Sequence, residues 1–449
     1  MQNARQLEAA HCFANHARHT FIQAWCDPSL DGKPVLAADS SFTFRNCSFF
    51  GADGVSLTYQ GSNGTFENNL WQSNDWSCHD VDTHTGAGCV LVDNARRGSW
   101  PGSSGDLFTR NTMIGNGASV MYSCGVNATM TLNHCLGQAD IDNDGVCLQI
   151  RSSSATGSTM AYNWAERSAK GFRLDSGSND AFVPEEVDNS IYANVALMTN
   201  GMELKNDYNT YAQNLALWPP PHGAVRAGAS AAAEVFRVDT GRFKGENSHS
   251  VLQGNVASSW ATPLAGVTSV QHPNVFDAKI GLEMRDPHNL DFRARDDTRL
   301  AQSGAGPYAS GVVSTVPGAE QHPCIRSSGL GSYYWIPGRR DWRPSSPVPP
   351  DHSGNVAPDL DLMFLPGLNR GRSNTSHVVW FGPTEAQMVQ LAPPLRPGCN
   401  VQRLSGHTPL KPNSSWVWRV DEIPAASTGY NAAAAKRGAV WRFTVRAAK

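Results

Sequence analysis

The sequence predicts an all-β protein in which short parallel strands stack coil upon coil, followed by a second, smaller β domain. Two observations predict the coils: an asparagine recurs after a short strand-like run, and a glycine that opens a second short run recurs after most of these asparagines. Short runs bounded by turn residues are typical of strands. The second domain is predicted by longer alternating runs that begin only after about residue 344.

The asparagine repeat sets the period of the coils. Three of its intervals are 20 or 22 residues, two are about 30 and one is 43. Periods in this range predict units that stack on one another and share one continuous core. We expect each asparagine to lie inward at a bend and to bond the backbone of neighbouring coils. The repeat consists of Asn46, Asn68, Asn111, Asn133, Asn163, Asn194 and Asn214.

The glycine-led runs predict which side chains fill the coils. In "GVCLQI", "GFRL" and "GMEL", which start at Gly145, Gly171 and Gly201, the first and third residues after the glycine are apolar. Because alternate residues of a strand face opposite sides, these apolar residues should face the interior. The second and fourth residues should face outward, and these are Cys147, Gln149, Arg173, Asp175, Glu203 and Lys205.

The asparagine and glycine pattern resembles the pectate-lyase-like superfamily of right-handed parallel β-helices, over residues 40–315. The resemblance implies that fold for this region. Residues 1–39 are expected to form an N-terminal cap region, because residues 3–25 carry helix formers without glycine or proline and could make a helix that closes the open end. Residues 290–311 look like the closing segment of such proteins.

The C-terminal part is expected to be a linker, residues 316–343, and a small β-sandwich, residues 344–449. The segment Pro347–Asp351, "WFG" at 380–382, "WVWRVDE" at 416–422 and "WRFT" at 441–444 resemble the fibronectin type III-like domain appended to carbohydrate-active enzymes. Trp418 and Trp441 are expected in its core rather than as platforms for sugars.

Composition excludes several functions and locations. The 449 residues carry a formal net charge of -3, and only 17% are charged, so no strong field attracts nucleic acid or an anionic membrane. No apolar run is long enough to span a bilayer, and Met1 does not lead into a signal peptide. We nevertheless expect an extracellular monomer, chiefly from the function argued below.

The charged outward positions predict a polysaccharide site. If the glycines align from coil to coil, Gln149, Asp175 and Lys205 form one ladder, with Arg173 and Glu203 beside it. Variable side chains on a rigid scaffold are a common way to build a site. A solvated face with incidental ion pairs is the alternative. The expected catalytic residues are Arg173, Lys205, Asp175 and Glu203, and the expected substrate-binding residues are Gln149, Arg151 and His134.

A loop before Gly145 predicts a cation site, which involves Asp140, Asp142 and Asp144. "NDGVCL" followed by "GFRL" is similar to the paired coils of one calcium-dependent pectate lyase family. The resemblance implies that Asp144 is a calcium ligand and Arg173 the base. Cys147 stands where that family has a second acidic residue, and arginine replaces lysine, which leaves both roles open. Calcium is the one expected cofactor.

These features predict cleavage of an acidic polysaccharide by β-elimination, which needs a cation for the carboxylate, a base and an acid. The first alternative is a glycoside hydrolase, with Asp175 and Glu203, or Asp144 and Asp175, as paired carboxylates. A non-catalytic carbohydrate-binding or adhesion protein is the second.

Overall fold

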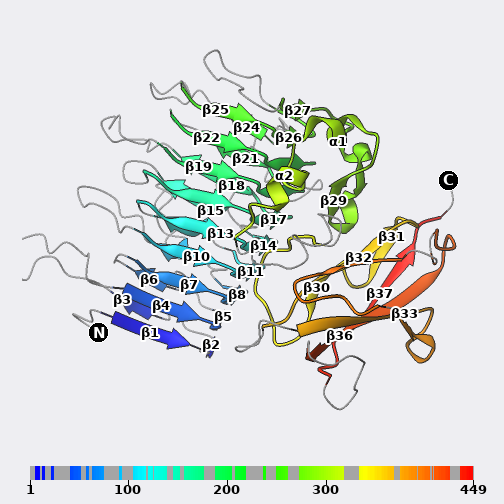
Figure 1. Cartoon of the computed structure of the whole chain (residues 1–449). Helices are drawn as coiled ribbons and strands as arrows, with labels where there is room; N and C mark the ends of the chain where they lie inside the picture. Colours follow the sequence, from blue (N-terminus) through cyan, green and yellow to red (C-terminus); the bar gives the residue numbers. More distant parts are fainter. Residues whose placement is uncertain are drawn as a thin grey trace, which may run out of the picture. The chain divides into compact units, whose positions relative to one another are not determined.

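The structure is a computed structural model of the whole chain, shown in Figure 1. It describes residues 6–10, 13–15, 22–24, 41–51, 57–59, 63–74, 90–93, 105–117, 120–124, 126–138, 145–151, 156–175, 188–204, 208–218, 236–238, 249–260, 273–317, 333–368, 375–391, 393–404, 407, 409–424 and 435–447. The chain divides into two compact units, one formed mainly by residues 1–280 and the other mainly by residues 281–449. Short segments, residues 305–307 and 337–339, belong to the first unit.

Three long parallel sheets make up the first unit, and the chain visits them in turn (Figure 1). Sheet A contains β1 (Gln6–Ala10), β4 (Ser41–Arg45), β7 (Thr65–Glu67), β10 (Leu107–Thr109), β13 (Thr129–Thr131), β16 (Thr159–Ala161), β19 (Ser190–Tyr192), β22 (Thr210–Ala212) and β25 (Val251–Gln253). Sheet B contains β2 (Phe13–Asn15), β5 (Ser48–Phe50), β8 (Leu70–Gln72), β11 (Thr112–Ile114), β14 (His134–Leu136), β17 (Trp164–Glu166), β20 (Val195–Leu197), β23 (Leu215–Leu217), β26 (Val256–Ala257) and β27 (Val275–Phe276). Sheet C contains β3 (Ile22–Ala24), β6 (Leu57–Tyr59), β9 (Val90–Asp93), β12 (Val120–Cys124), β15 (Val146–Arg151), β18 (Phe172–Asp175), β21 (Met202–Leu204) and β24 (Phe236–Val238).

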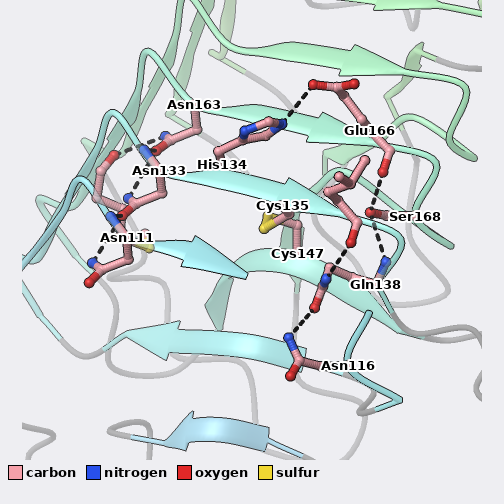
Figure 2. The surroundings of a disulfide bond; sticks show 12 residues. Asn111, Asn116, Asn133, His134, Cys135, Gln138, Cys147, Asn163, Glu166 and Ser168 are labelled. Carbon is pink, nitrogen blue, oxygen red and sulfur yellow. Dashed lines mark hydrogen bonds and ion pairs between the residues drawn. A yellow bond between two sulfur atoms is a disulfide. The ribbon is translucent and has the colours of Figure 1, made fainter. Parts of the chain in front are cut away.

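The bend between sheets A and B explains the repeated asparagine. Leu132 and Tyr162 at this bend have φ of 58° each, and the next residue is the asparagine. Asn133 Nδ2 donates to Asn163 Oδ1 at 3.0 Å, and Asn163 Nδ2 donates to Asn194 Oδ1 at 2.9 Å. The same Nδ2 atoms also donate to backbone carbonyls of the preceding coil, such as that of Met130. The expected asparagine ladder is therefore confirmed for this part of the stack (Figure 2).

The first two members of the predicted repeat are wrong by one residue. Asn46 and Asn68 have φ of 56° and 58°, so they are the left-handed bend residues rather than the inward ones. The inward positions are Cys47 and Asn69, because the backbone N–H of Cys47 donates to Asn69 Oδ1 at 2.9 Å. The physical reason is that asparagine suits both positions, since it tolerates the left-handed conformation and also bonds backbone groups.

Apolar side chains from all three sheets fill the space that the sheets enclose. Phe44 stacks on Phe66 with ring centroids 5.7 Å apart, and Phe108 stacks on Tyr122 at 4.1 Å. The predicted inward residues of the glycine-led strands are buried as expected: Val146, Leu148, Phe172, Leu174, Met202 and Leu204. Burial of this apolar surface is the main term that favours folding of the coils.

The helix predicted within residues 3–25 is wrong. The described residues of this segment form β1, β2 and β3, which pair in parallel with β4, β5 and β6. The helix formers of this segment are overridden because the edges of β4, β5 and β6 offer backbone hydrogen bonds to a further coil.

The second unit contains mostly antiparallel strands. Its elements are β28 (Met284–Asp286), η3 (Pro287–Asn289), β29 (Asp291–Ala294), α1 (Arg299–Ser303), α2 (Ser310–Val313), β30 (Ser345–Val348), β31 (Ser353–Val356), β32 (Asp361–Leu365), β33 (Thr375–Gly382), η6 (Glu385–Gln387), β34 (Val389–Gln390), β35 (Val401–Arg403), β36 (Ser415–Pro424) and β37 (Val440–Val445). Three strands form one sheet and five form another, in the orders β30-β32-β35 and β31-β37-β36-β33-β34. Trp418 and Trp441 are 0% and 5% exposed, which confirms that they are core residues. The domain boundaries expected near residues 39, 315 and 343 stay predictions.

Candidate functional site

The candidate site is a row of polar residues on sheet C. Gln149, Arg173 and Glu203 are direct register partners on the adjacent strands β15, β18 and β21. Neighbouring strands lie about 4.8 Å apart, so these three side chains are neighbours on one face. We call Gln149, Arg173 and Glu203, together with Lys170, the polar row.

The predicted ladder of Gln149, Asp175 and Lys205 is wrong in its register. Gln149 pairs with Arg173, while Asp175 pairs with Arg151. The glycines at 145 and 171 do not align, because Leu148 pairs with Phe172 and the two strands are therefore offset by two residues. An offset of two keeps each side chain on its face, so Gln149 and Arg173 share a face as predicted although the predicted neighbours change.

Hydrogen bonds and an ion pair connect the members of the polar row. Arg173 Nη2 donates to Gln149 Oε1 at 3.0 Å, and Lys170 Nζ lies 2.9 Å from Glu203 Oε2. Gln149 is 2% and Arg173 is 5% exposed, whereas the side chains of Lys170 and Glu203 keep 17% and 12% of their surface exposed. The Lys170–Glu203 pair is therefore the part of the row that solvent reaches. Arg173, which was expected on the outward face, is almost completely covered by its neighbours.

Polar residues continue this row along sheet C in both directions. Glu203 pairs with Arg237 of β24, so its register neighbours on both sides are arginines. On the other side, Gln149 pairs with Ser123, and Ser123 pairs with Asp93. A second row two residues along contains Arg151 and Asp175. Lys170, which immediately precedes Gly171, was not expected, and only the register of the folded chain shows that it reaches Glu203.

Four of the predicted site residues lie outside the described residues, namely Asp140, Asp142, Asp144 and Lys205. Their roles as calcium ligands and as a catalytic residue stay predictions. In the part of the chain that the structure describes, no group of three or more His, Cys, Asp and Glu side chains could hold a metal ion.

Cys147 does not face outward as expected, because it forms a disulfide with Cys135 (Figure 2). The two Cα atoms are 6.0 Å apart, a normal spacing for a disulfide, and both side chains belong to the buried core. The bond joins β14 of sheet B to β15 of sheet C, and Cys147 is two residues from Gln149. It thereby anchors the start of the strand that carries Gln149 of the polar row. In the sequence, the three predicted calcium ligands lie between the two cysteines.

His134, the third predicted substrate-binding residue, lies on sheet B rather than with the polar row. His134 Nε2 is 2.6 Å from Glu166 Oε1 (Figure 2). The ring of Trp164 meets the imidazole edge-on, with centroids 5.7 Å apart. The side chains of His134 and Glu166 are only 16% and 7% exposed. A Cβ added to Gly338 would come within 3.0 Å of His134 Cβ, so the segment 337–339 packs directly on this residue. Glu166, Trp164 and the segment 337–339 therefore hold the His134 side chain in place.

Comparisons of the chain with protein-family models, with curated proteins and with solved structures find no match. Among the described residues, no helix has the length and apolar character needed to cross a membrane.

Proposed function

We propose that the chain is an extracellular enzyme that cleaves an acidic polysaccharide by β-elimination on the outer face of sheet C. In this proposal the three parallel sheets are the faces of a right-handed β-helix of the pectate-lyase-like kind. Support comes from the regular path through the sheets and from the asparagine ladder between coils. The strands from β30 to β37 are proposed to form the fibronectin type III-like domain.

The observation that carries the function is the polar row, in which Lys170 and Arg173 flank a single carboxylate, that of Glu203. β-Elimination on a uronate begins with neutralisation of its carboxylate, which makes the C5 proton more acidic. Lys170, whose side chain is 17% exposed, is the cation of the polar row that a uronate carboxylate can reach.

Arg173 does not suit proton removal, and at 5% exposure it acts behind the Lys170 ammonium in charge neutralisation. A guanidinium normally keeps its proton to a pH above about 12, and Arg173 donates one of its N–H groups to Gln149. We therefore assign the base to Lys205, and the departing oxygen takes its proton from solvent. The base takes the C5 proton, the C4–O4 bond breaks, a C4–C5 double bond forms, and the departing oxygen receives a proton. No step depends on calcium.

A disulfide supports the extracellular location. Disulfides persist in oxidising compartments and are rare in the cytosol, and Cys135–Cys147 is buried in the core.

Non-catalytic binding is the second candidate, because one observation favours it. The charged groups of the polar row already bond each other, as in the pairs Arg173–Gln149 and Lys170–Glu203. A face of this kind could hold a glycan without any reacting group. Hydrolysis, the third candidate, needs a second carboxylate beside Glu203.

Incubation with pectic, alginate and sulfated algal glycans separates the three candidates. Products with an unsaturated end that absorbs in the near ultraviolet support elimination. Reducing ends without that absorbance would show hydrolysis, and binding without products would show a non-catalytic protein. The proposal would be overturned if the chain neither bound nor cleaved any of these glycans.

Variants of the ion pair test the site itself. Glu203→Gln should strengthen binding of an acidic glycan, because it frees the Lys170 ammonium for a substrate carboxylate. Lys170→Met should weaken binding about tenfold, because it removes the charge pair between the ammonium and a substrate carboxylate. The matched control is the ion pair Arg45–Glu67 of sheet A, whose atoms lie 3.0 Å apart and whose side chains are 47% and 43% exposed. Glu67→Gln and Arg45→Met should leave binding unchanged. Equal effects at both pairs would remove the polar row from the proposal.

A further inference from the structure

The bend that leads into sheet A carries two exposed aromatic rings at one end of the stack. Seven described bend residues have left-handed backbone with φ between 53° and 79°, and all are exposed: Asn63, Gly105, Asn127, Gly157, Asp188, Tyr208 and His249. The first four are asparagine or glycine, which adopt this conformation most easily. The last two are a tyrosine and a histidine on neighbouring coils.

Tyr208 and His249 stack on each other in the open. Their ring centroids are 4.6 Å apart and their planes are inclined by 14°. Tyr208 keeps 49% of its surface exposed, although tyrosine at positive φ is conformationally strained. The bend requires the left-handed conformation but does not require a tyrosine, and a strained residue where a less strained one would serve is a reason to look for a function. Glycine or asparagine would make this bend at a lower conformational cost.

The aromatic pair lies at the border of sheet C. Four peptide units separate Leu204, the last residue of β21, from Tyr208. An extended chain advances at most about 3.6 Å per residue, so the two Cα atoms are within about 14 Å. β21 also carries Glu203, so a glycan of a few sugar units is long enough to span from the polar row to the aromatic pair.

We propose that Tyr208 and His249 form an aromatic subsite that stacks against a pyranose ring of the bound glycan. The apolar C–H face of a pyranose matches the flat face of an aromatic ring, and a preformed stack loses little side-chain entropy on binding. The carboxylate-bearing residue Asp188, at the next bend position, is exposed beside the pair and its backbone N–H donates to the Tyr208 carbonyl at 3.1 Å. This inference rests on the proposed function, because it assumes that the polar row binds a glycan.

The test measures calorimetric affinity of the full chain for short oligosaccharides of pectin, alginate and a sulfated algal glycan. Tyr208→Asn should weaken binding about tenfold, because it removes the stacking ring. Its melting temperature should stay the same or rise, since asparagine suits the left-handed bend. Tyr208→Phe should bind like the unsubstituted chain. The matched control is Trp260→Ala, because Trp260 is a 39% exposed aromatic that stacks on Phe276 of sheet B.

Each outcome decides one of the two proposals. Binding by Tyr208→Asn as tight as by the unsubstituted chain would overturn the subsite and leave the polar row standing. An equal loss in Trp260→Ala would also overturn it, since the effect would not be specific to the bend. If the unsubstituted chain binds none of the oligosaccharides, the proposed function fails and the subsite fails with it.

Discussion

Replacing Asn163 with alanine should destabilise the first unit strongly, because this one side chain bonds three other residues in the core. Its Nδ2 donates to the Met130 carbonyl at 3.0 Å and to Asn194 Oδ1 at 2.9 Å. Its Oδ1 accepts from the backbone N–H and from Nδ2 of Asn133, at 2.8 and 3.0 Å. Asn163 is 0% exposed, so water cannot replace these partners without opening the coil.

The expected loss follows from counting what stays bonded after Asn163→Ala. Asn133 Nδ2 keeps the Phe108 carbonyl, and Asn194 Oδ1 keeps the backbone N–H of residue 163. The backbone N–H of Asn133 and the Met130 carbonyl each lose a buried partner. An unsatisfied buried group costs about 1–3 kcal/mol and a lost hydrogen bond about 1 kcal/mol, so the free energy of unfolding should fall by about 3–5 kcal/mol.

Denaturant unfolding measures this loss from the shift of the midpoint at unchanged slope. The matched control is Asn127→Gly, because Asn127 is an exposed bend residue with φ of 53°. Glycine adopts this conformation at little cost, so the control should change the unfolding free energy by less than about 0.5 kcal/mol. A loss below about 1 kcal/mol in Asn163→Ala would refute the reasoning that the ladder holds the coils together.

Three further predictions concern stability. Replacing both Cys135 and Cys147 with alanine should cost about 3 kcal/mol, because the disulfide closes a loop with a sequence separation of 12, and an unchanged melting temperature would contradict this. Arg173→Met should lower the unfolding free energy by about 1–3 kcal/mol, since Arg173 is 5% exposed and donates a hydrogen bond to Gln149. Chemical denaturation measures this loss, and an unchanged unfolding free energy would show that the hydrogen bond contributes nothing to stability. Burial raises the pKa of Asp286 above its ordinary value of 3.8, so the protonated form is favoured in the fold. Its contribution to stability is present below pH 3.8 and is lost as the pH rises through the folded pKa. Asp286→Asn should therefore stabilise the second unit above that window and flatten the pH dependence of its unfolding, and an unaltered pH profile would contradict the assignment.

The sequence reveals the period and the inward residues of the coils because both are local properties. Alternation within a strand of four to six residues, as in β15 and β18, separates Leu148 from Gln149 without knowledge of neighbours. The strands of sheet B were missed because they begin directly after the ladder asparagine and no glycine marks their start. Their length of three residues is no different from that of most strands of sheet A. Register was missed because loops of different length precede each glycine, so spacing in the chain does not fix pairing.

One signal in the sequence could have found Glu166. His134 follows Asn133 by one residue, and Glu166 follows Asn163 by three. Residues one and three after the ladder asparagine face the same side of sheet B, on strands that are neighbours because their asparagines are neighbours. Alignment on the asparagines, instead of on the glycines, therefore brings the two side chains together. No comparable signal exists for Lys170, which lies at a bend outside the alternating strand.

The observed register also decides what a hydrolase on sheet C would produce. Glu203 pairs with Arg173, so its nearest possible carboxylate partner on β18 is Asp175, two residues farther along that strand. Two residues along a strand cover about 6.6 Å and one strand spacing covers about 4.8 Å, which places the two Cα atoms about 8 Å apart. Because side chains on one face of a sheet project side by side, we expect the two carboxyl groups at a similar separation. Retaining enzymes need carboxyl groups about 5–5.5 Å apart, whereas inverting enzymes use about 6.5–9.5 Å. If the glycan panel gives reducing ends without unsaturation, nuclear magnetic resonance of the fresh product should therefore show the inverted anomer, and a retained anomer would exclude Asp175 and Glu203 as the catalytic pair.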